Sequence, residues 1–301
     1  MTLQERLRAY GELVRIPAVF TAPGDVILGC FLASVWIEIP WWSYLTLVAA
    51  SVCVYCAGMA LNDVRDVRED TDERPERPIP SGRIPLKDAW TAVFAMQALA
   101  LGIGAYVSLF ALASVALTIL LTYLYNSSLK ASHFGPILMG CCRYANVLIG
   151  LSAGGAELIA VEYFWVVACI PLFNVMYVFG LTHLARHEVH GADRNVVLRW
   201  ATYLFVVACL PVACAPVIFE ERAIWQSMAL LLIPVWLLPE FLKLMRDVSA
   251  VRIRFAVLRC IMGITVITGS FTLFAGGLWQ GSLILALLYP GKWFGRWFYA
   301  T

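Results

Sequence analysis

The sequence predicts an all-α polytopic membrane protein with nine transmembrane helices in one bundle. Its 301 residues are 61% apolar and only 14% charged, whereas soluble domains carry about 25% charged residues. Apolar runs recur along the whole chain with no soluble-looking block between them. We therefore expect residues 1–301 to form a single integral-membrane domain. The net charge of +2 is too small to indicate nucleic-acid binding.

The spans follow one another closely along the chain. About 20 apolar residues cross a bilayer as a helix. Eight such spans are expected at about 17–38, 43–61, 88–109, 111–125, 134–153, 160–183, 196–219 and 223–245. A last apolar stretch covers about 255–290, which is too long for one helix, and G-G-L-W-Q-G at 276–281 is expected to break it. The stretch thus supplies the ninth helix, with a tenth short or re-entrant piece as an alternative.

Basic residues predict the orientation, because Lys and Arg in short loops stay cytoplasmic. They gather in the N-terminal segment and after the second, fourth, sixth and eighth spans, and the intervening loops hold almost none. We expect the N-terminus and these polar loops on the cytoplasmic side of the membrane. Lys292 and Arg296 of the tail would lie outside after nine crossings, and their charge favours a re-entrant end.

A carboxylate-rich segment, N-D-V-R-D-V-R-E-D at 62–70, follows the second span. On a continuing helix, Asn62, Asp66, Asp70 and Asp63 fall within an arc of about 100°. Like charges at this spacing repel, and a bound cation removes the repulsion. Mg²⁺ takes oxygen ligands and combines one or two carboxylates with substrate phosphate oxygens. The segment predicts a metal–phosphate site; the alternative is a solvated helix end whose acids pair with Arg.

A basic, proline-rich segment comes next, E-R-P-E-R-P-I-P-S-G-R-I-P at 73–85. Four prolines exclude a regular helix, and Ser81-Gly82 indicates a turn. Such a stiff, basic loop suits a lid over an anionic substrate. A rigid connector between two spans is the alternative.

These two segments carry a resemblance to a known family. N-D-x-x-D-x-x-x-D followed by R-P-I-P-S-G-R resembles the signature of the UbiA superfamily of intramembrane prenyltransferases, and Y-N-S-S-L-K at 125–130 resembles its Tyr-and-Lys motif after the fourth span. The resemblance covers the whole nine-helix layout and implies a central cavity that opens to the cytoplasmic side. It implies Mg²⁺-dependent transfer of an isoprenyl group from an isoprenyl diphosphate, through an allylic carbocation, to a small acceptor. That acceptor would be an aromatic or quinone precursor or a polar cyclic alcohol.

The resemblance also assigns roles to residues. Asn62, Asp66 and Asp70 would hold Mg²⁺ on the diphosphate, and Lys130 would neutralise the diphosphate as it leaves. The further residues expected to contact substrate are Asp63, Arg77, Arg83 and Tyr125.

The second acidic motif of such enzymes is altered in this chain. After the sixth span, 181–195 offers only Glu188 and Asp193 as catalytic acids and metal ligands. Five residues apart, they lie about 140° from each other on an ideal helix. They share a face only if the helix stops between them, and Gly191 is the natural stop. The form E-V-x-G is similar to a bacterial branch of the superfamily found in ebo-type gene clusters, which implies a bacterial inner membrane.

Three histidines crowd into the same segment, His183, His187 and His190. Their spacing differs from the H-E-x-x-H zinc motif. His187 is a candidate contact to diphosphate or acceptor, or a base, and plain interfacial polar residues are the alternative. A metal-dependent membrane hydrolase that uses these histidines is one rival function.

Charged and amide side chains also lie inside predicted spans, where burial is costly and function is the default explanation. Asp25 lies in the first span, and Arg143 and Asn146 lie in the fifth. Either Asp25 pairs with Arg143 and locks two helices, or Arg143 and Asn146 contact substrate with Asp25 beside the acceptor. A secondary transporter with Asp25 and Arg143 as its coupling site is the second rival function. It leaves the loop acids and prolines unexplained.

Overall fold

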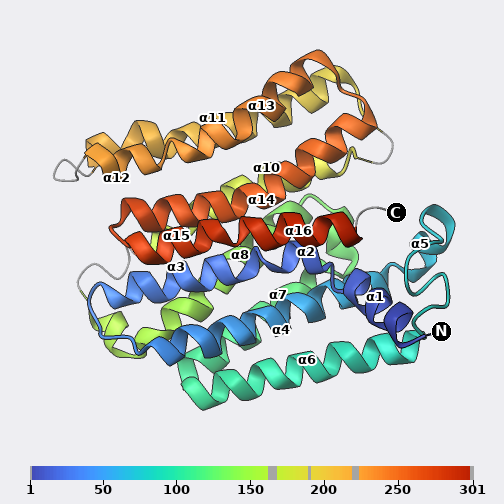
Figure 1. Cartoon of the computed structure of the whole chain (residues 1–301), viewed down its shortest axis with the longest axis horizontal. Coiled ribbons are helices and arrows are strands. Elements are labelled where there is room, and N and C mark those ends of the chain that lie inside the picture. Colours follow the sequence, from blue (N-terminus) through green and yellow to red (C-terminus); the bar gives the residue numbers. More distant parts are fainter. Residues whose placement is uncertain (1, 162–167, 189–190, 219–223, 299–301) are drawn as a thin grey trace.

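The computed structural model describes residues 2–161, 168–188, 191–218 and 224–298, and every regular element in these ranges is helical. The α-helices are α1 (Leu3–Leu13), α2 (Ile16–Val19), α3 (Ala22–Ser34), α4 (Trp41–Arg65), α5 (Val67–Glu73), α6 (Leu86–Val107), α7 (Leu109–Tyr125), α8 (Gly135–Leu151), α10 (Leu172–Ala185), α11 (Arg194–Ile218), α12 (Ile224–Ala229), α13 (Leu232–Arg246), α14 (Ala250–Phe274), α15 (Leu278–Ala286) and α16 (Leu288–Phe298). Short 3₁₀ turns are η1 (Ser128–Ala131), η2 (Ser152–Gly154) and η3 (Glu157–Ala160). The long helices lie side by side, and their connections gather at the two ends of the bundle (Figure 1).

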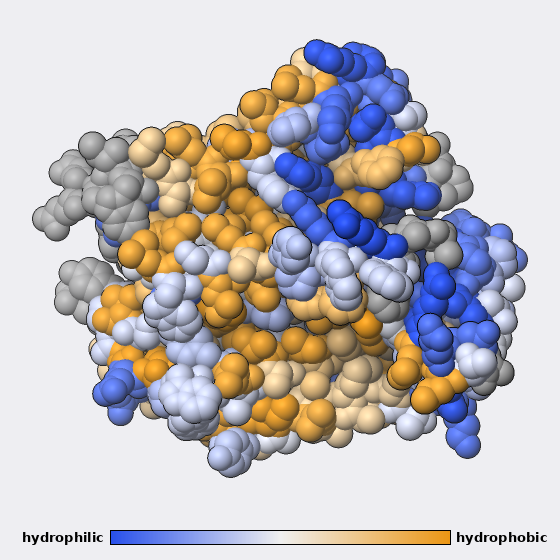
Figure 2. Space-filling view, in the orientation of Figure 1, coloured by the Kyte–Doolittle hydropathy of each residue, from blue (hydrophilic) through white to orange (hydrophobic). Residues whose placement is uncertain are grey.

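Helices long and apolar enough to cross a membrane run through the described residues. Seven meet that length and composition: Ile16–Ser34, Trp41–Arg65, Leu86–Val107, Gly135–Gly154, Arg194–Ala213, Gln226–Arg246 and Ala250–Phe274. The shorter apolar helices α7 and α10 lie where the fourth and sixth spans were predicted. Figure 2 shows apolar residues over the body of the bundle and hydrophilic residues gathered at the end that carries α1 and α5. The chain is therefore an all-helical integral membrane protein.

The predicted break in the last apolar stretch is confirmed. α14 ends at Phe274, Gly276 adopts φ +105°, and α15 begins at Leu278. The chain then turns back along the bundle, and the ring of Phe294 in α16 stacks on Phe20, with 5.6 Å between ring centroids. α16 therefore ends at the same end of the bundle as the N-terminus (Figure 1). This differs from nine crossings alone, which would place the tail on the opposite side, and agrees with the alternative of a short returning piece after the ninth helix.

A close crossing of α3 and α8 fixes the centre of the bundle. A Cβ on Gly29 would lie 2.3 Å from the carbonyl oxygen of Val147, and a Cβ on Gly150 would lie 2.2 Å from that of Val26. Only glycine allows the two backbones to approach this closely. Asp25 and Asn146 each lie one helical turn before these glycines, so the crossing brings the two polar side chains together.

Candidate active site at the polar end of the bundle

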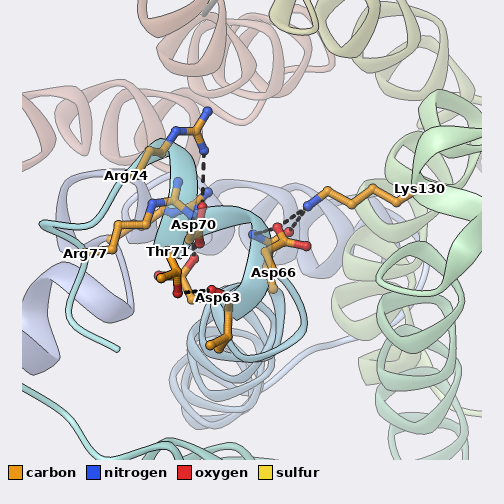
Figure 3. Close-up of polar contacts among 10 residues, drawn as sticks. Asp63, Asp66, Asp70, Thr71, Arg74, Arg77 and Lys130 are labelled. Carbon is orange, nitrogen blue, oxygen red and sulfur yellow. Dashed lines mark hydrogen bonds and ion pairs between the residues drawn. The ribbon is translucent and has the colours of Figure 1, made fainter. Parts of the chain in front are cut away.

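The carboxylate segment breaks its helix at Asp66. α4 ends at Arg65, Asp66 has φ −87° and ψ 6°, and α5 begins at Val67. The sequence-based prediction assumed one continuous helix, in which all four side chains share a face. The break instead divides them into two pairs, and each pair faces its own cation (Figure 3).

The first pair is Asn62 and Asp66, which share Lys130. Lys130 Nζ donates to Asn62 Oδ1 at 3.0 Å and forms an ion pair with Asp66 Oδ2. Asn62 Nδ2 also donates to Asp66 Oδ2, at 3.1 Å. One amide oxygen and one carboxylate oxygen thus converge on a single positive charge. Oxygen donors of this kind are the ligands that Mg²⁺ takes, so the donor set fits the ion that the motif predicts.

The second pair is Asp63 and Asp70, which share Arg77. Arg77 Nη1 lies 3.3 Å from Asp63 Oδ1 and 2.6 Å from Asp70 Oδ2. Burial raises the pKa of Asp70, the guanidinium of Arg77 opposes that shift, and the charges of Asp63 and Asp66 add to it. Asp70 is thus a carboxyl group whose charge depends on a nearby cation.

Arg15 also belongs to this site, although the sequence motifs did not indicate it. Its Nη2 lies 3.1 Å from Asp63 Oδ1. Among the described residues it is the one non-glycine residue with positive φ, at +52°. A left-handed conformation at a non-glycine residue costs about 1–3 kcal/mol and occurs preferentially at functional sites. The sequence feature that could have indicated Arg15 is the Arg-Ile-Pro sequence at the start of the first span, because Pro17 fixes the backbone just after Arg15.

Arg186 holds the turn that carries Lys130. Its Nη2 donates to the carbonyl oxygens of Lys130, at 3.1 Å, and Ser132, at 2.7 Å. These bonds join the connection after α10 to η1 and set the direction from which Lys130 approaches the carboxylates. Tyr125 is the last residue of α7, half-buried and just before this turn.

The proline-rich segment is tied to α1. Arg83 Nη1 lies 2.6 Å from Glu12 Oε2, and Arg83 Nη2 donates to the carbonyl oxygen of Glu76 at 2.6 Å. Ser81-Gly82 forms the predicted turn, with Gly82 at φ +72°. Arg77 therefore faces the carboxylates, whereas Arg83 faces Glu12.

The intramembrane polar residues form one buried network. Arg143 Nη1 lies 3.2 Å from Asp25 Oδ2, and Asn146 Nδ2 donates to the same oxygen at 3.1 Å. Ser51 Oγ donates to Asn146 Oδ1 at 2.6 Å, which joins α4 to the network. Asp25 is fully buried. The structure thus contains the helix-locking pair, one of the two alternatives that the sequence left open.

The second acidic motif is spread out. α10 ends at Ala185, before Glu188, so the helix does not continue to Gly191 as the prediction of a stop at that residue requires; Gly191 itself has a left-handed φ of +70°. Asp193 is exposed at the start of α11, and no ion pair or hydrogen bond in the described part of the chain joins it to Glu188. The role of Glu188 and Asp193 as metal ligands therefore remains a prediction.

The histidines are dispersed among packing partners. His183 stacks on Trp200, with ring centroids 4.0 Å apart. His187 is half-buried, and burial together with Arg186 and Arg199 lowers its pKa. His190 lies outside the described residues. Within residues 2–161, 168–188, 191–218 and 224–298, no three His, Cys, Asp or Glu side chains form a group that would hold a metal. This applies to the histidines and also to the three aspartates of the carboxylate segment, which face Lys130 and Arg77.

Comparison with known proteins decides between the candidate classes. Residues 26–258 match the model of the UbiA prenyltransferase family. The chain belongs to this family. Family membership favours a prenyltransferase over the transporter and hydrolase alternatives. The bacterial inner membrane and the ebo-type branch stay predictions.

Curated relatives and solved structures agree with the assignment. The chain is 30% identical over 187 residues to a digeranylgeranylglyceryl phosphate synthase of Sulfurisphaera tokodaii, covering 62% of this chain and 64% of that protein. It is 34% identical over 196 residues to the enzyme of the same name from Ignicoccus hospitalis, covering 65% and 62%. The match thus spans less than two thirds of these relatives.

The fold is similar to that of solved family members. A UbiA homolog from Aeropyrum pernix gives a TM-score of 0.67 at 16% identity, covering 84% of this chain and 96% of that one. A UbiA homolog from Archaeoglobus fulgidus bound to DMAPP and Mg²⁺ gives 0.59 at 15% identity, covering 89% and 99%. At these identities the similarity concerns the fold alone.

Proposed function

We propose that this protein transfers an isoprenyl group from an isoprenyl diphosphate to a small acceptor, with Mg²⁺ as cofactor. The carrying observation is the convergence of Asn62 Oδ1 and Asp66 Oδ2 on the ammonium of Lys130 at the polar end of the bundle. The Archaeoglobus fulgidus homolog binds Mg²⁺ together with DMAPP. This supports the combination of a metal ion with an isoprenyl diphosphate. Asn62, Asp66 and Asp70 would hold the metal, with Glu188 and Asp193 as proposed ligands of a second ion.

The protein's own residues supply most of the chemistry. Lys130 and Arg77 would bind diphosphate oxygens, and Asp63 keeps Arg77 directed into the site. Bound Mg²⁺ would neutralise charge on the leaving diphosphate. As the allylic C–O bond breaks, positive charge develops on the isoprenyl carbon, and the apolar bundle interior keeps water from capturing it. Preorganised cations act mainly on the charge that the diphosphate gains in the transition state. An acceptor nucleophile then forms the new bond to carbon.

The relatives suggest the class of acceptor. They are named as synthases of digeranylgeranylglyceryl phosphate, which favours a hydroxyl group of a glyceryl phosphate over the aromatic or quinone precursors and cyclic alcohols predicted from sequence. In this proposal Tyr125 and His187 would contact substrate. Asp25, Arg143 and Asn146 would instead join the helices within the bundle.

We further propose that residues 1–301 form one domain, with a central cavity and with the N-terminus and polar connections facing the cytoplasm. The gathering of hydrophilic residues at the end of the bundle that carries α1 and α5 supports this orientation (Figure 2). Thiol labelling of a single cysteine placed at Thr71, in a cysteine-free variant expressed in spheroplasts, tests it. Protection from an impermeant reagent supports the proposal, and labelling from outside contradicts it.

The test of function uses purified full-length protein in nanodiscs. Labelled isoprenyl diphosphates of 5, 10 and 20 carbons are supplied with glyceryl phosphate, geranylgeranylglyceryl phosphate, aromatic and cyclic-alcohol acceptors. Label should pass into an acceptor with Mg²⁺ and not with EDTA. Failure of every donor to transfer label to any acceptor, under conditions where binding of the diphosphate is measured, would exclude transferase activity.

A further inference from the structure

A basic groove lies between α13 and α14, away from the carboxylates of the candidate active site. It encloses about 290 Å³, and its lining includes Glu240 and Lys243 of α13 and Arg252, Phe255, Arg259 and Met262 of α14. Figure 2 shows hydrophilic side chains over this part of the molecule, in the upper right of the view. The lining carries three positive charges and one negative charge, so the groove as a whole attracts anions.

One cation of the groove, Arg259, is held in place by an aromatic ring. Arg259 stacks on Trp236, with its Cζ 3.6 Å from the ring centroid. Its Nε donates to the Trp236 carbonyl at 3.2 Å, and Trp236 Nε1 donates to the Arg259 carbonyl at 3.0 Å. Lys292 of α16 lies 5.0 Å from the same ring. Within the described residues, neither terminal nitrogen of Arg259 has a hydrogen-bond acceptor.

The depth of Arg259 requires an explanation. It is the tenth residue of α14, about 14 Å from the start of that helix at 1.5 Å per residue. A cation at this depth in a membrane helix is costly and marks a functional position by default. Glu240 does not neutralise it, because Glu240 pairs with Lys243 at 2.7 Å and with Arg252 at 4.0 Å.

Two polar atoms of the groove also lack hydrogen-bond partners in the described part of the chain. Arg252 Nε and Glu240 Oε2 are buried and have no hydrogen-bond partner among the described residues. Phe255, a large apolar side chain of the same lining, is 57% exposed. An anion with several acceptor oxygens would satisfy the guanidinium groups, and an attached apolar chain would cover this side chain.

We propose that the groove between α13 and α14 binds a phosphate group, supplied by an anionic membrane lipid or by soluble phosphate. Arg259 and Arg252 donate to the phosphate oxygens, as Arg does wherever phosphate is recognised, and Lys243 and Lys292 add positive charge. Basic pockets between membrane helices at the cytoplasmic side bind such head groups. This site is independent of the proposed transferase reaction, because it uses none of the residues of the carboxylate site.

Binding of phosphatidylglycerol to the full-length protein in detergent, followed by native mass spectrometry, tests the proposal. Phosphatidylcholine with the same acyl chains is the reference, and inorganic phosphate is the competitor. We expect phosphatidylglycerol or inorganic phosphate to bind in preference to phosphatidylcholine. The double variant Lys243→Gln/Arg252→Gln should weaken that binding about 10- to 30-fold. Competition by inorganic phosphate assigns the site to soluble phosphate, and lack of competition assigns it to the lipid.

The matched control removes two charges from the same helices outside the groove. Arg246→Gln/Arg254→Gln should change binding less than about threefold, since these exposed residues do not line the cavity. Glu240→Gln should strengthen binding by about fivefold, because it removes the one negative charge of the lining. Equal losses in the two double variants, or weaker binding in Glu240→Gln, would overturn the proposal. The expected gain in Glu240→Gln keeps the test decisive even if the Lys243→Gln/Arg252→Gln protein fails to fold.

Discussion

Lys130 and Asp66 form an ion pair across 64 residues of sequence. Lys130 belongs to the 3₁₀ turn after α7, and Asp66 is the residue at which α4 gives way to α5. The pair joins two helix ends and places an ammonium group beside the carboxylate that the motif assigns to metal binding. The positive and negative partners of a diphosphate site are thus already adjacent.

The first prediction concerns Lys130. Lys130→Gln removes the charge that would stabilise the leaving diphosphate, so kcat should fall about 10²- to 10³-fold. Steady-state kinetics with a labelled donor measures the effect. Lys87→Gln, a loss of an equal charge at the exposed start of α6, should leave kcat within about twofold. A similar loss in both variants would show that Lys130 has no special role.

The second prediction concerns the pH dependence of activity. The folded-state pKa of Asp70 is raised, so this carboxyl takes up a proton at a higher pH than an ordinary aspartate, whose pKa is about 3.9. If metal binding needs the ionised form, activity falls on acidification through that raised pKa. Arg77 opposes the shift, so Arg77→Gln should move the acidic limb of the kcat/KM profile to still higher pH.

Arg74 supplies the control for that profile. It lies 3.8 Å from Asp70 Oδ1, against 2.6 Å for Arg77 and Oδ2. Arg74→Gln should therefore shift the acidic limb by less than Arg77→Gln does. A limb that stays in place when Arg77 is replaced would contradict the coupling between Arg77 and Asp70.

The third prediction concerns the crossing of α3 and α8. Gly29→Ala and Gly150→Ala each place a Cβ within about 2.3 Å of a backbone oxygen of the other helix, so each should lower the free energy of unfolding by about 1–3 kcal/mol. Gly102→Ala is the control, because its Cβ meets nothing within 4 Å. Thermal unfolding in detergent should show a lower Tm for the first two variants only, and equal Tm values in all three would refute the steric account.

The fourth prediction separates the two roles left open for Asp25. As a helix lock, Asp25→Asn leaves Arg143 with an unpaired buried charge and should cost about 3–5 kcal/mol of stability. Arg143→Gln in the same chain should restore part of the loss, as a double-mutant cycle would show. Asp88→Asn, which breaks an exposed pair with Arg6 at 3.6 Å, should change stability by less than about 1 kcal/mol. A large fall in kcat with unchanged Tm would instead assign Asp25 to the acceptor.

Much of the fold was predictable from the sequence because it depends on local pattern. Apolar runs place the helices, and Gly276 marks the break after α14, since glycine allows the positive φ that the reversal needs. The carboxylate segment was found for the same reason, since its residues are neighbours in sequence.

The rest depends on contacts between distant segments. Arg15 meets Asp63 across 48 residues, and Arg186 bonds Lys130 across 56. Neither contact follows from periodicity, because both depend on how the helix ends meet after packing. The sequence did not predict the break at Asp66 for a related reason. Helical spacing predicts where side chains lie only while the helix continues. Here the helix is interrupted at Asp66, and residues before and after the interruption form ion pairs with Lys130 and Arg77, which are distant in sequence.

The most direct test of the central claim measures Mg²⁺-dependent transfer of label from an isoprenyl diphosphate by four variants. Asp66→Asn and Asp70→Asn alter the carboxylate site. Glu69→Gln and Asp72→Asn alter exposed neighbours of that site and serve as controls. The carboxylate site predicts near wild-type transfer in the two neighbours and a loss of about 10²-fold or more in Asp66→Asn and Asp70→Asn. Wild-type transfer by folded Asp66→Asn and Asp70→Asn proteins would contradict it.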